Sequence, residues 1–262
     1  MNQQIPCFVV NLATAKARRQ SMAKMLARLG ITPTWFDAVD GRIMSDDVLA
    51  HQVDRVRADE EYGPLSRAEI GTSLSHLGIY QRMVEQNVPC AVILEDDVEL
   101  AEDFPLLLDA QGSQGLATAF QPEEPVMVQM THVRRAYRWG RTPLGRRQIV
   151  KPHGGVWLTS GYFITLAAAR HLLKNAYPVF MVADHWRYFE SKGWLTIYAL
   201  TPNAVWESEH SQQSDITAAG RVSRRKDAKS LVGRCRRLMD RLFLQPILVS
   251  RLPENKKDTQ QD

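Results

Sequence analysis

The sequence predicts an α/β fold around a mostly parallel sheet, because short apolar runs alternate along the chain with segments of helical periodicity. The first apolar run covers residues 8–12, and apolar side chains then recur every three or four positions over residues 13–29. A second short run follows at 34–36. A strand, a helix and a strand in this order are typical of a βαβ unit, whose two strands run parallel.

The rest of the chain continues this alternation. Ser66 and Glu69 have the spacing of a capping box, which predicts a helix over 66–86. Residues 42–64 are charged and weakly patterned, which favours a helix with loops. The Arg-rich segment 134–150 contains glycines and is expected to be a mobile loop. We further expect strands at 91–94, 126–130, 157–165 and 194–200, and a helix at 167–175.

Charge divides the chain into two parts. Residues 221–262 carry 12 Lys/Arg and 5 Asp/Glu, whereas the whole chain has a net charge of only +4, so the remainder is slightly acidic. We therefore expect one large domain over residues 1–220, followed by a basic extension over 221–262. In the extension, apolar and arginine side chains fall on separate faces of a helix around residues 231–243.

Such a basic amphipathic helix is typical of attachment to an anionic membrane surface, here through residues 221–250. The alternative is a C-terminal helix that packs on the body and leaves its basic face in solvent. No nucleic-acid partner is expected, because the basic excess is confined to the extension and aromatic residues are not interleaved with it.

The cysteines and the N-terminus indicate the compartment. The three cysteines are scattered, which fits a reducing environment better than a disulfide framework. The first residues lack the features of a signal peptide, and no apolar run is long enough to span a bilayer. We expect a cytoplasmic protein that lies peripherally at the inner face of the cytoplasmic membrane.

Three consecutive carboxylates follow the apolar run 91–94, namely Glu95, Asp96 and Asp97. Ionised carboxylates repel one another and resist burial, so this arrangement favours a compensating cation. Ligands of open α/β sheets bind beyond the carboxyl ends of the strands, and hard oxygen donors suit Mg²⁺ or Mn²⁺. The alternative is a solvated acidic turn whose aspartates cap a helix.

An ordered set of motifs over residues 8 to 216 resembles glycosyltransferase family 25. The matching segments are Val9-Val10-Asn11-Leu12, Arg18-Arg19, Phe36-Asp37-Ala38-Val39-Asp40-Gly41, Leu65-Ser66-Arg67-Ala68-Glu69-Ile70-Gly71, Leu74-Ser75-His76, Leu94-Glu95-Asp96-Asp97-Val98, Ser160-Gly161-Tyr162-Phe163-Ile164 and Val182-Ala183-Asp184-His185. The resemblance implies a GT-A type Rossmann-like sandwich and a metal-dependent, inverting transfer of a hexose, expected to be galactose. It also implies a UDP-sugar donor, Mn²⁺ or Mg²⁺, and a lipid-linked oligosaccharide acceptor of the lipooligosaccharide type.

Three departures from the family pattern bear on the sugar and the acceptor. The acidic motif begins with Glu95, Thr72 stands where a cysteine is common, and Thr159-Ser160-Gly161 replaces a more usual Gly-Ala-Gly.

The resemblance assigns roles to the acidic residues. Asp97 is expected to bind the metal, and Glu95 and Asp96 are expected to hold the ribose, the sugar hydroxyls or metal-bound water. Asp184 is expected to be the general base, since an ionised carboxylate can accept the proton of an acceptor hydroxyl. The alternative for Asp184 is the N-cap of a helix over 185–190.

Two histidine motifs carry further expectations. His210 is expected to return to the metal from the C-terminal side, with Glu207 as a neighbouring alternative or a plain surface histidine as the simpler interpretation. His76 shares one helix face with Glu69, which could line the donor cleft, and the alternative is a half-buried structural histidine. Ser75, in the same motif, is also assigned to donor binding.

The remaining donor residues follow strand ends. Asn11, Arg18 and Arg19 come after the first strand, where a diphosphate would meet a guanidinium, although one arginine is expected on a solvated helix face. Asp40 could meet the uracil or ribose, or simply form a turn. Gly161 could allow close approach of the donor sugar, or mark a bulge.

Two further functions remain open for the whole chain. A sugar nucleotidyltransferase also uses strand-end carboxylates, but the segment 11–19 lacks the glycines of a triphosphate loop. A non-catalytic, membrane-associated nucleotide-sugar binding protein would keep the site without turnover.

Overall fold

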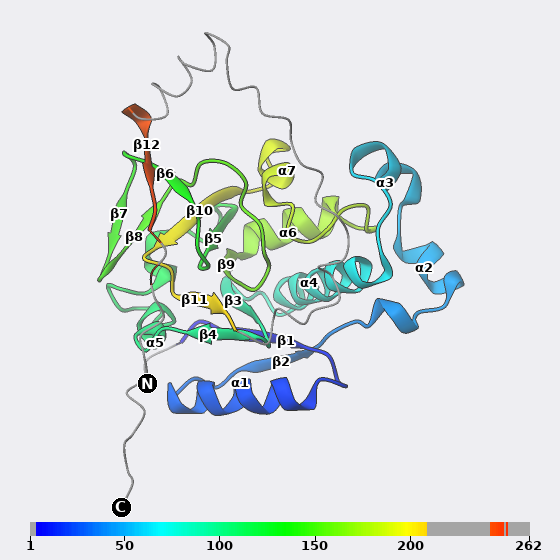
Figure 1. Ribbon diagram of the computed structural model, residues 1–262, viewed down its shortest axis with the longest axis horizontal. Helices are drawn as coiled ribbons and strands as arrows, with labels where there is room; N and C mark the ends of the chain where they lie inside the picture. Colours follow the sequence, from blue (N-terminus) through cyan, green and yellow to red (C-terminus); the bar gives the residue numbers. More distant parts are fainter. Residues whose placement is uncertain (1–3, 209–241, 249, 251–262) are drawn as a thin grey trace, which may run out of the picture.

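The computed structural model describes residues 4–208, 242–248 and 250 and centres on one sheet of eight strands (Figure 1). Their spatial order is β2 (Thr34–Asp37), β1 (Cys7–Asn11), β3 (Cys90–Glu95), β9 (Gly161–Thr165), β5 (Val126–Gln129), β10 (Thr196–Thr201), β8 (Arg147–Val150) and β7 (Thr142–Leu144). Strand β1 pairs in parallel with β2 and β3, and β5 with β10. Strands β9 and β8 run against the other strands of this sheet. The α/β class and the mostly parallel sheet are therefore confirmed.

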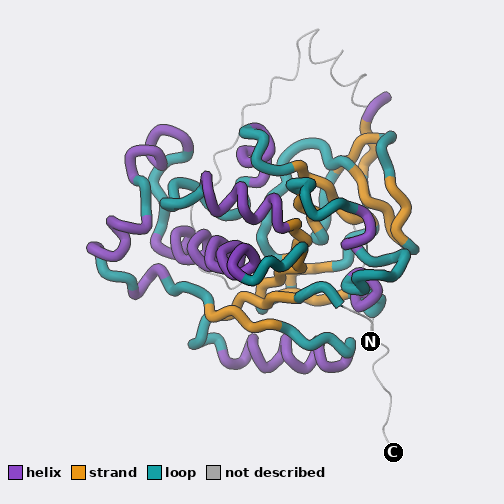
Figure 2. Tube along the Cα trace, turned by 180° about the vertical axis from the view of Figure 1, so that it is seen from behind, coloured by secondary structure: helices purple, strands orange, loops and turns teal. Residues whose placement is uncertain are grey.

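Helices cover both faces of the sheet (Figures 1 and 2). One face carries α1 (Lys16–Arg28) and the short α5 (Phe104–Leu107), and the other carries α4 (Arg67–Glu85), α6 (Leu166–Asn175) and α7 (Trp186–Ser191). The alternation along β3 explains this division. Ile93 joins the apolar cluster beneath α4, whereas Val92 and Leu94 join the cluster beneath α1.

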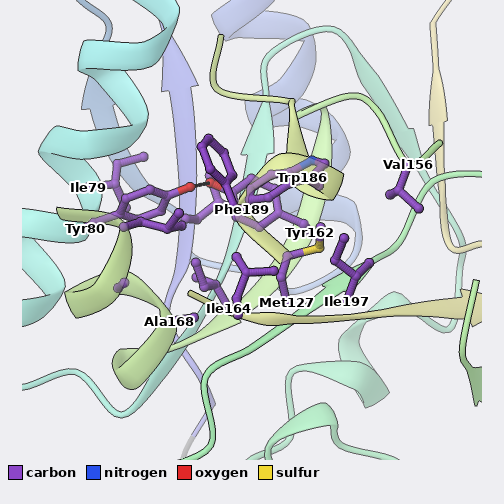
Figure 3. Packing of buried hydrophobic residues seen from close by; sticks show 14 of the residues in the cluster. Ile79, Tyr80, Met127, Val156, Tyr162, Ile164, Ala168, Trp186, Phe189 and Ile197 are labelled. Carbon is purple, nitrogen blue, oxygen red and sulfur yellow. Dashed lines mark hydrogen bonds between the residues drawn. The ribbon is translucent and has the colours of Figure 1, made fainter. Parts of the chain in front are cut away.

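The core on the α4 face is rich in aromatic side chains (Figure 3). Tyr162 of β9 and Tyr80 of α4 are buried, and their hydroxyl groups are hydrogen-bonded at 2.7 Å. Trp186 packs edge-on against Tyr162 at 4.9 Å between ring centroids. These contacts fix α4 and α7 on β9, and therefore fix the residues that both helices present at the strand ends.

The expected capping box begins α4. The Ser66 hydroxyl accepts a hydrogen bond from the Glu69 N–H at 3.2 Å, and the Glu69 carboxylate accepts one from the Ser66 N–H at 2.8 Å. Close packing then follows at Gly71, where a Cβ atom would lie 2.5 Å from the carbonyl oxygen of Val39. Residues 42–64 form the 3-10 helix η1 (Gly41–Ile43), α2 (Asp46–Gln52) and α3 (Arg55–Glu61), as the expected helix with loops.

The expected mobile loop at 134–150 is wrong, because this segment contains three strands. β6 (Arg135–Tyr137) pairs with β12 (Leu244–Pro246), and β7 and β8 extend the main sheet from β10. The strands β12 and β10, which pair with β6 and β8, lie far away in the sequence, so no local pattern indicates those two pairings. β7 and β8 form a local hairpin whose turn contains Gly145. A second small ribbon joins β4 (Val98–Leu100) to β11 (Val205–Glu207), and η2 (Leu116–Ala119) connects α5 to β5.

Residues 242–248 and 250, which fall within the expected extension, contact the body. Leu244 of β12 is buried, and the Trp206 indole donates a hydrogen bond to the Ser250 carbonyl oxygen at 2.7 Å. Of the amphipathic helix predicted around 231–243, only residues 242 and 243 belong to the described part of the chain. Within the described part of the chain, no helix combines the length and apolarity needed to cross a bilayer.

Candidate functional site

The candidate site lies at the edge of the sheet where β1 and β3 end and β9 begins. Val10 is in register with Glu95, and Leu94 with Gly161. The Glu95 N–H donates to the Ser160 carbonyl oxygen at 3.0 Å, which continues the ladder to the end of β3. Parallel strands bring their carboxyl ends to one edge, and the antiparallel β9 adds its first residues to the same edge.

The charged centre of this edge consists of Arg18, Asp96 and Asp97, and the neutral side chain of Asn11 lies beside them. The buried Asn11 amide donates a hydrogen bond to the Asp96 carboxylate. Arg18 reaches back from α1, with its Nε atom 3.4 Å from an Asp96 oxygen and its Nη1 atom 3.9 Å from an Asp97 oxygen. Two carboxylates therefore share one guanidinium, and that guanidinium stays partly exposed.

Electrostatics at this centre favour a positively charged ligand. Burial, together with the charges of Glu95 and Asp96, raises the pKa of Asp97 to about 6, although Arg18 opposes the shift. Burial also raises the pKa of Asp96, against the hydrogen bond from Asn11 and the charge of Arg18. The Oδ1 atom of Asn11 is buried without a hydrogen-bond partner. A cation near these oxygens would relieve the repulsion.

Glu95 belongs to a second chain of contacts that leads into the core. Its carboxylate accepts a hydrogen bond from Thr159 at 2.5 Å, and its Oε1 atom lies 3.8 Å from Nε2 of His76. The other ring nitrogen of His76 contacts the Tyr162 hydroxyl at 2.8 Å. Burial acts to raise the pKa of Glu95, but His76, Thr159 and Arg18 outweigh it and lower the pKa below its ordinary value. Glu95 is therefore ionised and positioned by its neighbours.

Asp184 faces the same edge from the segment before α7. Its carboxylate accepts a hydrogen bond from the Leu158 N–H at 3.3 Å, and Leu158 adopts a left-handed conformation with φ 77°. Burial and the charge of Glu95 raise the pKa of Asp184, against the bond from Leu158. His185, not Asp184, occupies the N-cap of α7, so the N-cap alternative for Asp184 is wrong.

Aromatic rings line the approach to Asp184. The Trp157 side chain is 49% exposed and stacks on His185, with ring centroids 5.0 Å apart and an interplanar angle of 11°. Tyr62, which is 40% exposed, contacts the same histidine edge-on at 5.9 Å. This arrangement presents flat apolar surface beside a carboxylate, which suits the apolar face of a sugar ring.

The other residues assigned to the donor have different neighbours. Arg19 stacks over Trp35 at 4.4 Å and pairs with Asp37 at 3.3 Å, so it is the arginine of the solvated face. The Asp40 carboxylate is paired with Arg42 at 2.8 Å, and this bond lowers its pKa.

Ser75 and Gly161, two small residues that were assigned to donor binding, have structural contacts within the protein. The Ser75 hydroxyl donates to the Gly71 carbonyl oxygen at 2.7 Å and accepts from the Val39 N–H at 2.9 Å. A Cβ atom at Gly161 would lie 2.8 Å from Val205, so this glycine makes room for β11. Their donor roles remain predictions, and His210 lies outside the described residues.

Three residues at this edge, Thr159, Gln129 and Trp157, are not among those predicted from the sequence. Thr159 was noted only as a departure from a motif, yet its hydroxyl binds Glu95. Gln129 is fully buried at the end of β5, and its amide donates to the Trp157 carbonyl oxygen at 3.0 Å. The sequence signal for Gln129 was a polar side chain at the end of an apolar strand, the position where site residues of an α/β sheet lie. Trp157 carried no local signal, because its position depends on a loop conformation.

No set of three His, Cys, Asp or Glu side chains among residues 4–208, 242–248 and 250 is arranged to hold a metal ion. Asp96 and Asp97 nevertheless offer hard oxygen donors with excess negative charge, which suits Mg²⁺ or Mn²⁺ if phosphate and water complete the coordination. A cavity of about 270 Å³ lies elsewhere, lined by Cys90, Phe120 and Thr165. These residues are at the opposite end of β3 and β9, so we do not assign the cavity to the site.

Comparison with known proteins identifies the family. The model of "Glycosyltransferase family 25 (LPS biosynthesis protein)" matches residues 4–186. The chain is 28% identical over 185 residues to "Inactive glycosyltransferase 25 family member 3" of Mus musculus, with 64% of this chain and 28% of that protein covered. It is 29% identical over 192 residues to "Procollagen galactosyltransferase 1-B" of Xenopus laevis, with 66% and 28% covered.

The chain thus spans less than a third of the length of these two relatives. A solved glycosyltransferase involved in the glycosylation of the major capsid of PBCV-1 aligns with 71% of this chain and 74% of its own, at 10% identity and a TM-score of 0.34.

Proposed function

The chain belongs to glycosyltransferase family 25, and from this premise we propose that it transfers a hexose from a UDP-sugar to a saccharide acceptor. The observation that carries the proposal is the meeting of Arg18, Asp96 and Asp97 at the edge of the sheet that Asp184 also faces. A sugar transferase needs a charged centre that binds the donor diphosphate, here Arg18 with Asp96 and Asp97. It also needs a nearby base for the acceptor hydroxyl, here Asp184. The name of the Xenopus relative supports galactose as the sugar.

The donor's diphosphate lies at Arg18, whose guanidinium offers a fork of N–H donors. Asp96 and Asp97 repel a bare diphosphate, so these carboxylates would hold a divalent cation when the donor binds. Mn²⁺ or Mg²⁺ held by Asp97, with Asp96 beside it, would neutralise charge on the departing UDP. Asn11 fixes the Asp96 carboxylate, and His76 and Thr159 fix Glu95, which faces the sugar hydroxyls.

The chemical step is a single displacement with inversion. The acceptor oxygen forms a bond to the anomeric carbon while the bond from that carbon to the diphosphate oxygen breaks, and UDP leaves with the electron pair. Asp184 takes the proton of the acceptor hydroxyl. Its raised pKa makes this carboxylate a stronger base than an ordinary aspartate, and the Leu158 N–H keeps it oriented.

The acceptor enters along Trp157 and Tyr62, beside Asp184. The family description supports an acceptor of the lipopolysaccharide type. A lipid-linked oligosaccharide is such an acceptor, and a peripheral position at the inner face of the cytoplasmic membrane would bring the site to it. The basic residues of 221–250 fit such a surface by their charge.

The test is UDP release by the purified full chain. UDP-galactose, UDP-glucose and UDP-N-acetylglucosamine are each compared with Mn²⁺, Mg²⁺ or EDTA, and slow donor hydrolysis serves as the readout without an acceptor. We expect release with one preferred donor and none with EDTA. Asp37→Asn is the matched control, because Asp37 ends the neighbouring strand but pairs with Arg19. Equal loss in Asp37→Asn and Asp97→Asn would argue against the assigned site.

A second candidate function is binding without turnover. The mouse relative's name describes an inactive protein, and the described residues hold no complete metal set. A thermal shift with UDP and Mn²⁺, but no UDP release from any donor with any acceptor glycan, would favour this alternative. Absence of both binding and release would exclude both functions.

A further inference from the structure

A basic and partly apolar surface lies outside the candidate site. No aspartate or glutamate occurs between Glu124 and Asp184, whereas seven arginines and two lysines do. Three exposed arginines, Arg134, Arg135 and Arg138, gather in the segment that was expected to be a loop. These three positions lie in and beside β6, close to the C-terminal strand β12.

The pairing of β6 with β12 brings Trp139, which follows β6, against Phe243, which precedes β12. Tyr137 is in register with Leu244, and the Arg138 N–H donates to the Phe243 carbonyl oxygen at 3.1 Å. Trp139 then packs edge-on against Phe243, with ring centroids 5.1 Å apart at 83°. Trp139 remains 54% exposed, and Leu242, next to Phe243 in the chain, is 58% exposed. We call Arg134, Arg135, Arg138, Trp139 and Leu242 the β6 patch.

Hydrogen bonds connect the strands next to the β6 patch. Arg141 donates a hydrogen bond to the Gln245 side chain at 2.6 Å and to the Gln148 side chain at 3.2 Å, so it joins β12 to β8. The Ile247 N–H donates to the Arg134 carbonyl oxygen at 3.0 Å. Arg135 therefore lies in a hydrogen-bonded strand, and Arg134, Arg138 and Trp139 lie directly beside that strand.

The composition of the patch fits the boundary layer of an anionic membrane. A tryptophan has an apolar body and a polar N–H, so it is favoured at the level of the lipid headgroups, and a neighbouring leucine can enter the same layer. Arginines beside them can bind lipid phosphates. A nucleic acid would match the charge but would leave the aliphatic Leu242 without an apolar partner.

The sequence strengthens this argument by continuity. Leu242 directly follows residues 221–241, which carry nine Lys/Arg and two Asp. The stretch of sequence before Leu242 is therefore also cationic. Figure 1 places β6 and β12 at one end of the molecule and α2 and α3 at the other.

We propose that the β6 patch docks on an anionic phospholipid surface, with Trp139 and Leu242 in the headgroup layer and the arginines on the phosphates. The proposal stands on surface residues alone and does not depend on the transferase activity.

The test is co-sedimentation of the full chain with two kinds of vesicle, phosphatidylcholine alone and equal parts of phosphatidylcholine and phosphatidylglycerol. We expect binding to the anionic vesicles only. Arg134→Gln and Arg138→Gln should each weaken it roughly fivefold, which corresponds to about 1 kcal/mol per basic residue near an anionic surface. Trp139→Ala combined with Leu242→Ser should weaken binding without changing the salt dependence.

The matched control is Arg55→Gln combined with Val56→Ala, an exposed basic and apolar pair on α3 at the far end of the molecule. It should bind the anionic vesicles as the original chain does. Trp139→Phe keeps the aromatic contact with Phe243, and a thermal melt of each variant shows that the fold is retained. Full binding by the patch variants, equal loss in the control, no binding to either vesicle, or equally strong capture by duplex DNA would each overturn the proposal.

Discussion

Asp103 and Arg147 form a one-to-one ion pair, whereas Asp96 and Asp97 share the single guanidinium of Arg18. Arg147 is buried and makes two hydrogen bonds to the Asp103 carboxylate, one of them 2.8 Å long. The contacts of Arg18 are 3.4 and 3.9 Å. The hydrogen bond from Arg147 lowers the pKa of Asp103, while burial and neighbouring carboxylates raise that of Asp97 to about 6.

This difference separates a stabilising charge from a functional one. A paired carboxylate lowers the free energy of the fold, because its ionised form is better solvated by its partner than by water. Carboxylates in excess raise that free energy until a ligand neutralises them. An uncompensated cluster at a strand end is therefore a better indicator of a binding site than the mere presence of acidic residues.

The largest expected effect is on activity. Asp97→Asn should reduce metal-dependent UDP release by about 100-fold or more, because it removes the charge that we propose holds the metal. In EDTA its thermal unfolding midpoint should equal or exceed that of the original chain, since one repelling charge is gone. A marked loss of stability would mean that the cluster is a structural pair like Asp103 and Arg147.

A smaller effect, on stability only, is expected at the ion pair. Asp103→Asn should cost about 2 kcal/mol in the free energy of unfolding, because buried Arg147 loses its charged partner while Asp103 itself is partly exposed. Urea unfolding followed by circular dichroism would measure it. UDP release below the unfolding temperature should be unchanged. A loss of activity would mean that the Asp103–Arg147 pair also contributes to function and not to stability alone.

The same pair should respond to acid. A lowered pKa in the folded state means that the contribution of Asp103 is complete above its ordinary value of 3.8 and is lost as the pH falls through the lower folded value. The stability gap between the original chain and Asp103→Asn should therefore be constant at neutral and mildly acidic pH. It should narrow below about pH 4. A gap that is independent of pH down to complete protonation would show that the two residues interact through packing rather than charge.

The smallest expected effect is at Trp157, the uncharged aromatic residue beside Asp184. Trp157→Ala should raise the KM for a glycan acceptor about fivefold, the size expected for one stacking contact of about 1 kcal/mol. Donor hydrolysis without acceptor should stay within twofold of the original rate, a margin of about 0.4 kcal/mol. Trp157→Phe should recover part of the acceptor affinity. An equal fall in the rate of transfer to the glycan and in the rate of donor hydrolysis would indicate that Trp157 acts by holding Asp184.

Local patterns predicted the parts of the fold that local interactions determine. The capping box of Ser66 and Glu69, the βαβ unit and the buried strand before Glu95 were all readable from spacing and composition. The strands in 134–150 were not predicted. β6 and β12 are about a hundred residues apart, β8 joins the sheet through the distant β10, and the short β7–β8 hairpin has only Gly145 as its local signal. Long-range pairing decides such segments.

The candidate site divides in the same way. Asp96, Asp97 and Arg18 follow strand ends, so the topology alone brought them together. Arg19, one position later, points to Trp35 and Asp37 because successive helix positions face different directions. The positions of Trp157 and Thr159 could not be predicted from the sequence. The chain turns between them at Leu158, which has a positive φ although leucine rarely adopts one.

The reversed direction of β9 has a consequence for how such a protein can change. Because β9 begins where β3 ends, the loop before it, with Trp157 and Thr159, borders the carboxylates while the loop after β3 carries them. The two sides of the site thus depend on separate stretches of chain anchored to adjacent strands. The stretch before β9, where we propose that the acceptor enters, can therefore change in length or sequence while β1 and β3, which carry the proposed donor residues, keep their register.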